Sequence, residues 1–342
     1  GRISVCRWPG PGYHDQLRYL TTSADKPGLG VSPHDGIMWG VYTDGRMQWL
    51  SGAPWTTRQR YVDAQARIIE TVCAREGGVT ATQTTFVLPS RDVLVCRLSV
   101  SGLSAPPVLY WFAGFAPCTR LLPELPIADW RLDDTNDFAV FRDITSQVTY
   151  HFRPNDMRAK LWELARDNIA NNALPQRWGK LGDGVWIGST SPNRIAAFQC
   201  GLVNQPGSPL ERADTGTLSG ATAAAGHCES ALALTPDNEA DGYSATVCVA
   251  FGKSMANVDA LVQQVRSTPV DALQDETIRA GRAWAARLPL PNTGNPELAA
   301  LATRCITAML TATDASSGAC VYLPITQPPL AIKEKLASRI KV

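Results

Sequence analysis

The sequence predicts a mainly β protein, in which a large antiparallel β-sandwich is followed by helices toward the carboxyl end. Three observations lead to this prediction. Short β-type runs cut by Gly, Pro, Asn and Asp occupy residues 1–253. Two of these runs meet at Gly77-Gly78, where two glycines supply the positive φ of a tight hairpin. After Phe251 the apolar residues instead recur at the three- and four-residue steps of helices.

The strand candidates follow one another at spacings typical of a sandwich. In chain order they are 37–42, 67–76, 80–88, 92–100, 108–115, 138–141, 148–152, 185–188, 195–200 and 245–251. Those between 67 and 100 are consecutive and predict an antiparallel meander. One interruption, from Met157 to Ala173, has helical periodicity and is expected to cover an edge or a face of the sheet.

Three helices are expected after the last strand. The first follows a Ser254 or Asn257 cap, and the second runs from Ile278 to Leu288. The third opens at Asn295-Pro296-Glu297, which combines an N-cap, a proline at the first helical position and an acidic first turn, and it ends near Asp314. The predicted organisation is a β-sandwich domain over 1–253, a helical linker over 254–292 and a second domain that begins at 293 and runs to 342.

The composition is that of a globular protein and excludes several partners. Hydrophobic residues make up 44% and charged residues 18% of the chain. The 32 basic and 31 acidic residues leave a net charge of +1 and form no basic patch, so no nucleic acid is expected. No apolar run is long enough to span a bilayer, so no membrane is expected either.

The cysteines favour a cytoplasmic location. The nine cysteines include no CxxC pair, and an odd number cannot all be paired within one chain. Most lie in apolar runs such as Val93-Leu94-Val95-Cys96, where a reduced thiol behaves as a small hydrophobe. The chain begins at Gly1 without a signal segment, so this end says nothing about the compartment.

Motifs for phosphate, metal and nucleotide binding are broken in this sequence. Gly252-Lys253-Ser254 lacks the glycine of a phosphate loop, because Val247 stands there, and is expected to be a strand end that enters a helix. The acidic run 237–242 resembles the start of a calcium loop, but Cys248 replaces the bidentate Glu, so we expect a hairpin turn. The scattered histidines lack metal spacing and are expected at the surface or hydrogen-bonded in strands: His14, His34, His151 and His227. No metal and no cofactor are expected.

Catalytic residues are not identified either. No G-x-S-x-G elbow occurs, and Gly28-Leu29-Gly30 lacks the rest of a dinucleotide fingerprint. Asp133-Asp134 and Asp137 are adjacent in a polar loop, which does not place one acid on each side of a scissile bond. The ten tryptophans offer faces on which sugar rings stack, but core packing is the favoured interpretation for any one of them.

The order of elements resembles the bacterial glucoamylase and glucodextranase family of glycoside hydrolases, family 15, in its amino-terminal part. The similar segments are 7–12, the hairpin strands 70–100, Trp284 to Pro289, and the tail 298–329 with Asp314-Ala315-Ser316-Ser317-Gly318-Ala319. The resemblance implies a supersandwich, linker helices and the first helix of an incomplete α/α barrel. It also implies that Thr326 and Gln327 lie toward the sugar site as substrate-binding residues.

The sequence departs from this family after the tail. The family continues with a Trp/Tyr-Pro-Arg-Asp segment that grips the sugar, whereas this chain reads Ala331-Ile332-Lys333-Glu334. The two barrel glutamates of inverting hydrolysis have no counterpart, so no catalytic residue is assigned. The resemblance therefore implies a noncatalytic amino-terminal fragment of an α-glucan hydrolase, which is inactive alone and binds oligosaccharide or polysaccharide in the full-length enzyme. A stand-alone carbohydrate-binding or structural sandwich and a fragment of a disaccharide phosphorylase remain alternatives.

Overall fold

The computed structural model describes residues 2–3, 5–8, 14–18, 36–63, 65–89, 91–115, 139–154, 184–203, 205–226, 228–287 and 294–311. The chain divides into two compact units, Gly1–Pro289 and Leu290–Val342. The domain boundaries at 253 and 292 stay a prediction. The helix expected between Met157 and Ala173 lies outside the described residues, as do Thr326 and Gln327.

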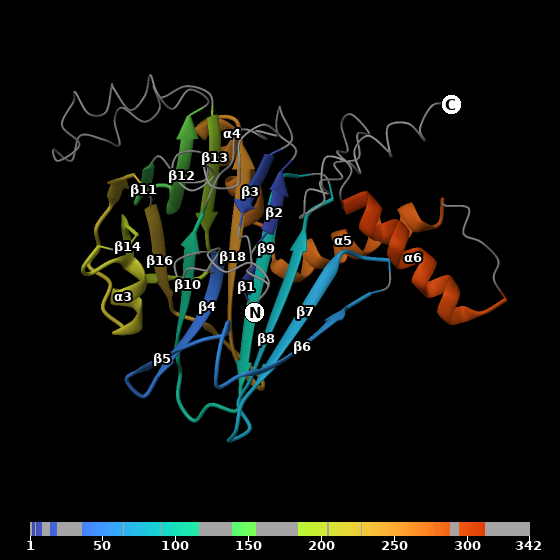
Figure 1. Ribbon diagram of the computed structural model, residues 1–342, viewed down its shortest axis with the longest axis horizontal. Helices are drawn as coiled ribbons and strands as arrows, with labels where there is room; N and C mark the ends of the chain where they lie inside the picture. Colours follow the sequence, from blue (N-terminus) through green and yellow to red (C-terminus); the bar gives the residue numbers. More distant parts are fainter. Residues whose placement is uncertain are drawn as a thin grey trace, which may run out of the picture. The chain divides into compact units, whose positions relative to one another are not determined.

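Two large antiparallel sheets form the first unit (Figure 1). In the described part, the smaller sheet has six strands in the order β1 (Arg2–Ile3), β4 (Gly36–Thr43), β10 (Val108–Gly114), β16 (Cys228–Leu234) and β14 (Ile195–Leu202), with β5 (Arg46–Trp49) paired to β4. A separate hairpin joins β2 (Val5–Trp8) and β3 (His14–Arg18).

The larger sheet has ten strands among the described residues. Their order is β15 (Ala223–Ala225), β11 (Ala139–Asp143), β12 (Val148–Pro154), β13 (Gly184–Thr190), β18 (Gly242–Gly252), β9 (Val93–Ser101), β8 (Thr80–Val87), β7 (Ile68–Ala74) and β6 (Thr56–Tyr61), and β17 (Asp237–Glu239) pairs with β18. The helices are α3 (Pro209–Asp214), α4 (Met255–Arg266), α5 (Val270–Ala285) and α6 (Pro296–Thr311). The predicted antiparallel sandwich followed by helices is confirmed.

The predicted meander is β7, β8 and β9, and the hairpin turn between the first two is where the sequence placed it. Gly77 and Gly78 have φ of 86° and 79°, a region that residues with a Cβ rarely adopt. The two strands pair in register from Ile68 with Phe86 to Ala74 with Thr80. The turn therefore sets the register that directs alternate side chains of both strands to the same face.

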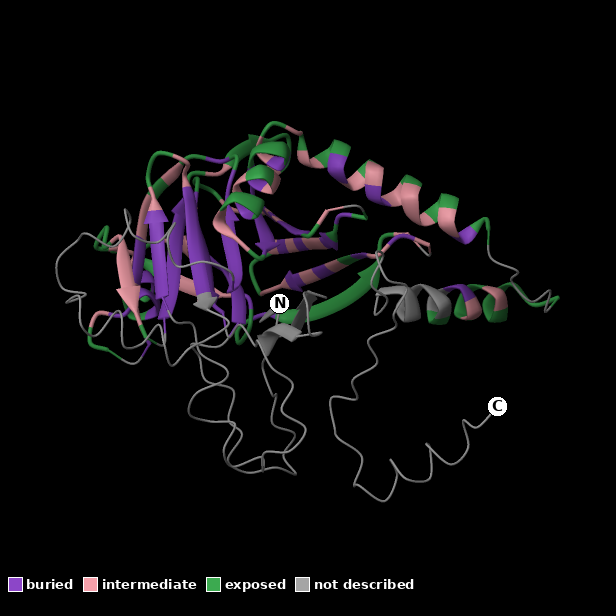
Figure 2. Ribbon diagram, turned by 90° about the horizontal axis from the view of Figure 1, so that it is seen from above, coloured by how far each residue is buried: buried purple, intermediate pink, exposed green. Residues whose placement is uncertain are grey.

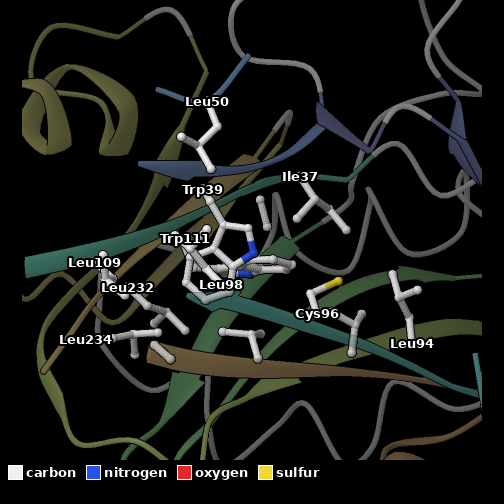
Figure 3. Close-up of a cluster of buried hydrophobic side chains, with 14 of the residues drawn as sticks. Ile37, Trp39, Leu50, Leu94, Cys96, Leu98, Leu109, Trp111, Leu232 and Leu234 are labelled. Carbon is white, nitrogen blue, oxygen red and sulfur yellow. The ribbon is translucent and has the colours of Figure 1, made fainter. Parts of the chain in front are cut away.

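The inner faces of the two sheets enclose the main core (Figure 3). Trp39 of β4 and Trp111 of β10 are paired across these strands, and their rings meet edge to face at 5.0 Å. Both side chains are fully buried against residues of β9 such as Leu98. Burial of such large rings is the main favourable term in folding, because each removes about 150–250 Å² from water.

Helices α4 and α5 cover part of the outer face of the larger sheet. Ser254 caps α4 by accepting a hydrogen bond from the amide of Asn257, as the sequence predicts. Val258 and Val262 of this helix are fully buried against the sheet. Figure 2 shows buried strands below the helices and an exposed β6 at the sheet edge.

Ion pairs hold α5, and Gly281 of this helix lies directly against the backbone of Gln65 and Ala66. Arg91 pairs with Glu276, and Arg97 of β9 pairs with Asp271 at 2.7 Å. Near the helix end, Arg282 pairs with Asp63 at 2.7 Å. These contacts join the helix to the β8–β9 turn, the sheet face and the β6–β7 loop.

The second unit is described over α6 alone. Asn295 caps this helix by accepting a hydrogen bond from the amide of Glu297 at 2.9 Å, and Pro296 occupies the first helical position. Leu298 and Leu301 are 51% and 56% exposed. The predicted start of the helix is confirmed, and its predicted end near Asp314 falls outside the described residues.

Substitution of Gly188 by Ala should loosen α4. A Cβ at Gly188 of β13 would meet the side chain of Val258 and lie 3.1 Å from that of Val148, so α4 or the sheet must shift. We expect G188A to lower the free energy of unfolding in urea by about 1–3 kcal/mol. The control is G52A, which has open space and should change stability by less than about 0.5 kcal/mol. Equal effects of the two variants would contradict this packing.

Acid should weaken the attachment of α5. Burial, the largest single effect, raises the pKa of Asp63, but the hydrogen bonds from Arg282 and the amides of Gln65 and Ala66 together lower it below the usual value. A carboxylate whose pKa is lower in the folded protein than in the unfolded one stabilises the fold at pH values above the unfolded-state pKa, which is near 4. This stabilisation is lost as the pH falls through the pKa of the folded state.

The variant D63N should therefore be less stable than the wild type at pH 7, and the difference should shrink between about pH 5 and pH 3. Urea unfolding at several pH values measures it. The control is D44N, since Asp44 is exposed in a turn. A stability difference for D63N that stays constant over this range would show that the carboxylate charge does not stabilise the fold.

Candidate functional site

The described tryptophan side chains fall into two groups. Four of them are buried: Trp39, Trp55, Trp111 and Trp186. For these, the interpretation as core residues is confirmed. Trp49 and Trp284 are only half-buried. Trp284 lies on α5, whereas Trp49 lies at the end of β5 on the outer face of the smaller sheet, where it adjoins polar groups of α3.

Sheet register places Trp49 in an aromatic group on this outer face. Trp49 pairs with Gly40 of β4, and Tyr42 of β4 pairs with Met47 of β5. Beneath them, Phe112 of β10 is fully buried, with its ring 6.1 Å from that of Trp49 and nearly perpendicular to it. We call Trp49, Tyr42 and Asp214 the rim site, because they lie where this aromatic group meets the surface.

The carboxyl end of α3 supplies the polar part of the rim site. The indole Nε1 of Trp49 donates a hydrogen bond of 2.6 Å to Oδ1 of Asp214, the last residue of this helix. The hydroxyl of Tyr42 lies 3.4 Å from the carbonyl oxygen of Thr215. The side chain of Asp214 is exposed, and no cation in the described part of the chain pairs with it.

Burial raises the pKa of Tyr110, the partner of Gly40 on β10, and neighbouring Tyr42 adds to the rise. The phenol of Tyr110 therefore remains neutral at neutral pH. The only formal charge of the rim site is the carboxylate of Asp214. The arrangement offers an apolar face with a hydrogen-bond acceptor beside it, which suits binding better than proton transfer.

A buried polar pair inside the sandwich resembles a nucleophile and its base. Nε2 of His151 on β12 lies 2.8 Å from Oγ of Ser230 on β16. Both residues are buried, and the ring of Phe115 packs edge to face on His151 at 4.7 Å. A substrate cannot reach this pair, because it is enclosed between the two sheets. Its hydrogen bond instead has a structural role, since it joins the larger sheet to the smaller one. His151 is thus one of the hydrogen-bonded strand residues that the sequence predicts.

Arg142 lies near this pair, also between the sheets. Its guanidinium donates to Oγ1 of Thr149 at 3.0 Å and to Oε1 of Gln147 at 2.7 Å, and it lies 4.9 Å from the ring centre of Phe198. Burial lowers the pKa of Arg142. Burial raises the pKa of the Cys200 thiol to about 12, because it outweighs the opposing effect of the nearby Arg142 charge. The thiol therefore stays protonated and is not a nucleophile.

Glu229 is a buried carboxylate that the sequence did not single out. It lies on β16 beneath α3 and accepts a hydrogen bond of 3.0 Å from the amide of Leu210 in the first helical turn. Ser208 caps the same helix by accepting from the amide of Glu211. These acceptors satisfy amides that have no partner within the helix. A single glutamate in a strand carries no sequence signal for this role.

Arginines engage several other carboxylates. The pairs are Arg60 with Glu70, Arg91 with Glu276, Arg97 with Glu239 and Asp271, and Arg282 with Asp63. Burial, the largest single effect, raises the pKa of Glu239, but the hydrogen bonds from Ser244 and Arg97 together lower it below the usual value. A general acid needs a raised pKa, so Glu239 and Asp63 are unsuited to that role.

The structure supports the sequence interpretation of two rejected motifs. Gly252-Lys253-Ser254 joins the end of β18 to the start of α4. The acidic run 237–242 is the hairpin between β17 and β18. Within the described ranges, no group of three His, Cys, Asp or Glu residues is arranged to hold a metal ion, and none of the helices there has the length and apolar character needed to cross a membrane.

The predicted substrate residues Thr326 and Gln327 lie outside the described residues, as do Asp133-Asp134 and Asp137. Side chains are described for His151 but not for His14, His34 or His227. The rim site is therefore the candidate binding site that the described residues offer. Trp49 belongs to the set of ten tryptophans in the sequence, but nothing in the sequence separates it from the buried ones.

No family model and no curated protein matches the sequence. Solved structures do give matches. A bacterial glucoamylase, solved in complex with acarbose, superposes with a TM-score of 0.59 and 10% identity over 82% of this chain and 36% of its own. An inverting mannosidase of family GH92 from Bacteroides thetaiotaomicron gives a TM-score of 0.44 and 10% identity over 80% of this chain and 29% of its own. This chain thus shares its fold with part of the glucoamylase and spans 36% of that protein's length.

Removal of the Glu229 carboxylate should destabilise the α3 region. In E229A the amide of Leu210 loses its buried acceptor, so we expect a loss of about 1–3 kcal/mol in the free energy of unfolding. E229Q keeps a side-chain oxygen and should lose less. The control is E76A, at an exposed turn, with a change below about 0.5 kcal/mol. Urea unfolding checks all three, and an E229A protein as stable as E76A would contradict the assigned contact.

Proposed function

We propose that this chain is the amino-terminal, noncatalytic part of a glycoside hydrolase that acts on α-glucans. The observation that carries the proposal is the likeness in fold to the bacterial glucoamylase over 82% of this chain. The resemblance of 284–330 to the start of a barrel domain supports it independently. In this proposal the sandwich supports, and partly borders, the sugar site of an α/α barrel formed by further residues.

The chemistry of the described residues agrees with a noncatalytic role. Inverting hydrolysis needs two carboxyl groups about 6.5–9.5 Å apart, one of them with a raised pKa. Asp63 and Glu239 instead have lowered pKa values and serve as partners of arginines. The Ser230–His151 pair is enclosed, and the Cys200 thiol is protonated. None of these groups has the accessibility or the protonation state that a nucleophile or a general acid needs at an anomeric carbon.

A stand-alone carbohydrate-binding sandwich is the second candidate. The half-buried Trp49 beside the exposed Asp214 favours it, since such a pair suits a sugar ring without any barrel. The sequence of the gene downstream of the Val342 codon discriminates between the two. A Trp-Pro-Arg-Asp segment followed by a long helical region supports the hydrolase proposal, and a stop codon at that place supports the second candidate.

The purified chain should not hydrolyse maltooligosaccharides, dextran or trehalose. The physical reason is that the two barrel glutamates have no counterpart in this sequence. Glucose release is measured by coupled assay at increasing protein concentration, with the variant W39A purified in parallel to reveal contaminating hydrolases. Glucose release that scales with wild-type protein and is absent from the W39A preparation, which loses a fully buried core side chain, would overturn the proposal. Sugar phosphate released only with inorganic phosphate would indicate the phosphorylase alternative.

A further inference from the structure

Trp49 differs from the buried tryptophans in both exposure and chemistry. Trp39 and Trp111 are fully buried and face the larger sheet, whereas Trp49 is half-buried and bonded to an exposed carboxylate. We propose that the rim site, formed by Trp49, Tyr42 and Asp214, binds one pyranose ring of a neutral glucan chain. This inference rests on the proposed function, because the chemical class of the ligand is taken from it.

The indole of Trp49 is fixed before any ligand arrives. A Cβ on Gly40 would lie 2.9 Å from Cε3 and Cζ3 of the indole, so the ring lies directly against the β4 backbone. Phe112 supports it from the core side, and Asp214 fixes its Nε1. A side chain held in this way loses little rotamer freedom on binding, which removes a cost that mobile side chains incur.

The same close contact explains why β4 has glycine at this position. A Cβ at Gly40 would also lie 2.6 Å from Sδ of Met47, so a larger side chain there would force the side chains of Met47 and Trp49 away from the β4 backbone. Similarly, a Cβ on Gly216, just after α3, would meet the ring of Tyr42. The glycines on either side thus allow the two aromatic rings and the end of α3 to converge.

Asp214 supplies the polar half of a sugar site. Its Oδ1 accepts the bond from Trp49, and no donor among the described residues bonds its Oδ2. A carboxylate oxygen is a strong acceptor for a sugar hydroxyl, while the C–H face of a pyranose packs on an aromatic plane. The hydroxyls of Thr215 and Thr217, 2.8 Å apart and exposed, lie next in the chain and offer further partners.

The charge of the rim site selects among ligands that stack on aromatic rings. A nucleotide brings phosphates, which the Asp214 carboxylate repels. A quaternary ammonium ion would be attracted, but such cations are bound by cages of several aromatic faces, and here only Trp49 and Tyr42 of the rim site reach the surface while Phe112 is buried. A neutral sugar uses both the ring and the acceptor without opposing charge. The cationic ligand remains an outcome that the experiment distinguishes.

The first test uses the wild-type chain. The side-chain indole signals of the ¹⁵N-labelled protein are recorded during titration with maltoheptaose, and the Trp49 signal is identified by its loss in W49F. We expect a saturable shift of the Trp49 signal and none of the Trp284 signal. Sorbitol, which has hydroxyls but no pyranose face, should produce no shift. A shift confined to other tryptophans, or no saturable shift, would overturn the inference.

Variants then measure the contribution of each part by calorimetry with maltoheptaose. W49A should weaken binding by at least about tenfold, and D214A by a smaller factor. The matched control W284A removes the half-buried tryptophan of α5, and its affinity for maltoheptaose should stay within about twofold of the wild type. If W49A proves unfolded by circular dichroism, W49F and the wild-type titration decide. Equal losses in W49A and W284A would overturn the inference.

Two further measurements separate this inference from the proposed function. Tetramethylammonium chloride replaces maltoheptaose in the same titration, and saturation of the Trp49 shift by this cation without any response to the sugar would overturn the inference. Glucose release is followed in the same samples. If the chain neither binds sugar nor releases glucose, the rim-site inference is overturned and the noncatalytic proposal stands. If the chain releases glucose, the proposed function is overturned, whether or not the Trp49 signal shifts.

Discussion

Burial of the two inner sheet faces against each other is the constraint on which the rest of the structure depends. Trp39 and Trp111 lie side by side in the smaller sheet and project into this interface. Such large, rigid side chains fix the spacing and the register of the sheets, since a shift by one residue would turn a ring outward. The His151–Ser230 hydrogen bond then joins the sheets where polar groups interrupt the core.

With the inner faces committed to the core, the two outer faces are free to serve different purposes. The larger sheet carries α4, whose Val258 packs over Gly188, and α5, which is held by the ion pairs of Arg91, Arg97 and Arg282. The smaller sheet receives only the short α3 in the described part, so its aromatic residues reach the surface beyond the helix end. One layout thus yields a covered face and a partly open one.

Local patterns predicted much of this layout but not its edges. The strands from 68 to 101 were predicted because alternating apolar residues and Gly77-Gly78 agree. Strand β6 was not predicted from the sequence, because its six residues are exposed and show no alternation of apolar and polar side chains. Strand β16 was not predicted either, because the central Ser-Ala-Leu-Ala is also compatible with a helix. Exposure of Trp49 depends on Gly40 and on the end of α3, which lie 9 and 165 residues away in the chain, so no local pattern reveals it.

A noncatalytic sandwich and a sugar-binding rim are physically compatible, because they place different demands on the same residues. Catalysis needs a carboxylic acid kept protonated by an apolar or like-charged environment. Binding of a sugar hydroxyl needs a hydrogen-bond acceptor beside a rigid apolar face, and the exposed side chain of Asp214 next to Trp49 provides one. On the larger sheet, hydrogen bonds that include those from Arg282 and Arg97 outweigh burial and lower the pKa values of Asp63 and Glu239. The described charges are thus suited to attachment of helices on one face and, in the proposed rim site, to binding of a sugar on the other.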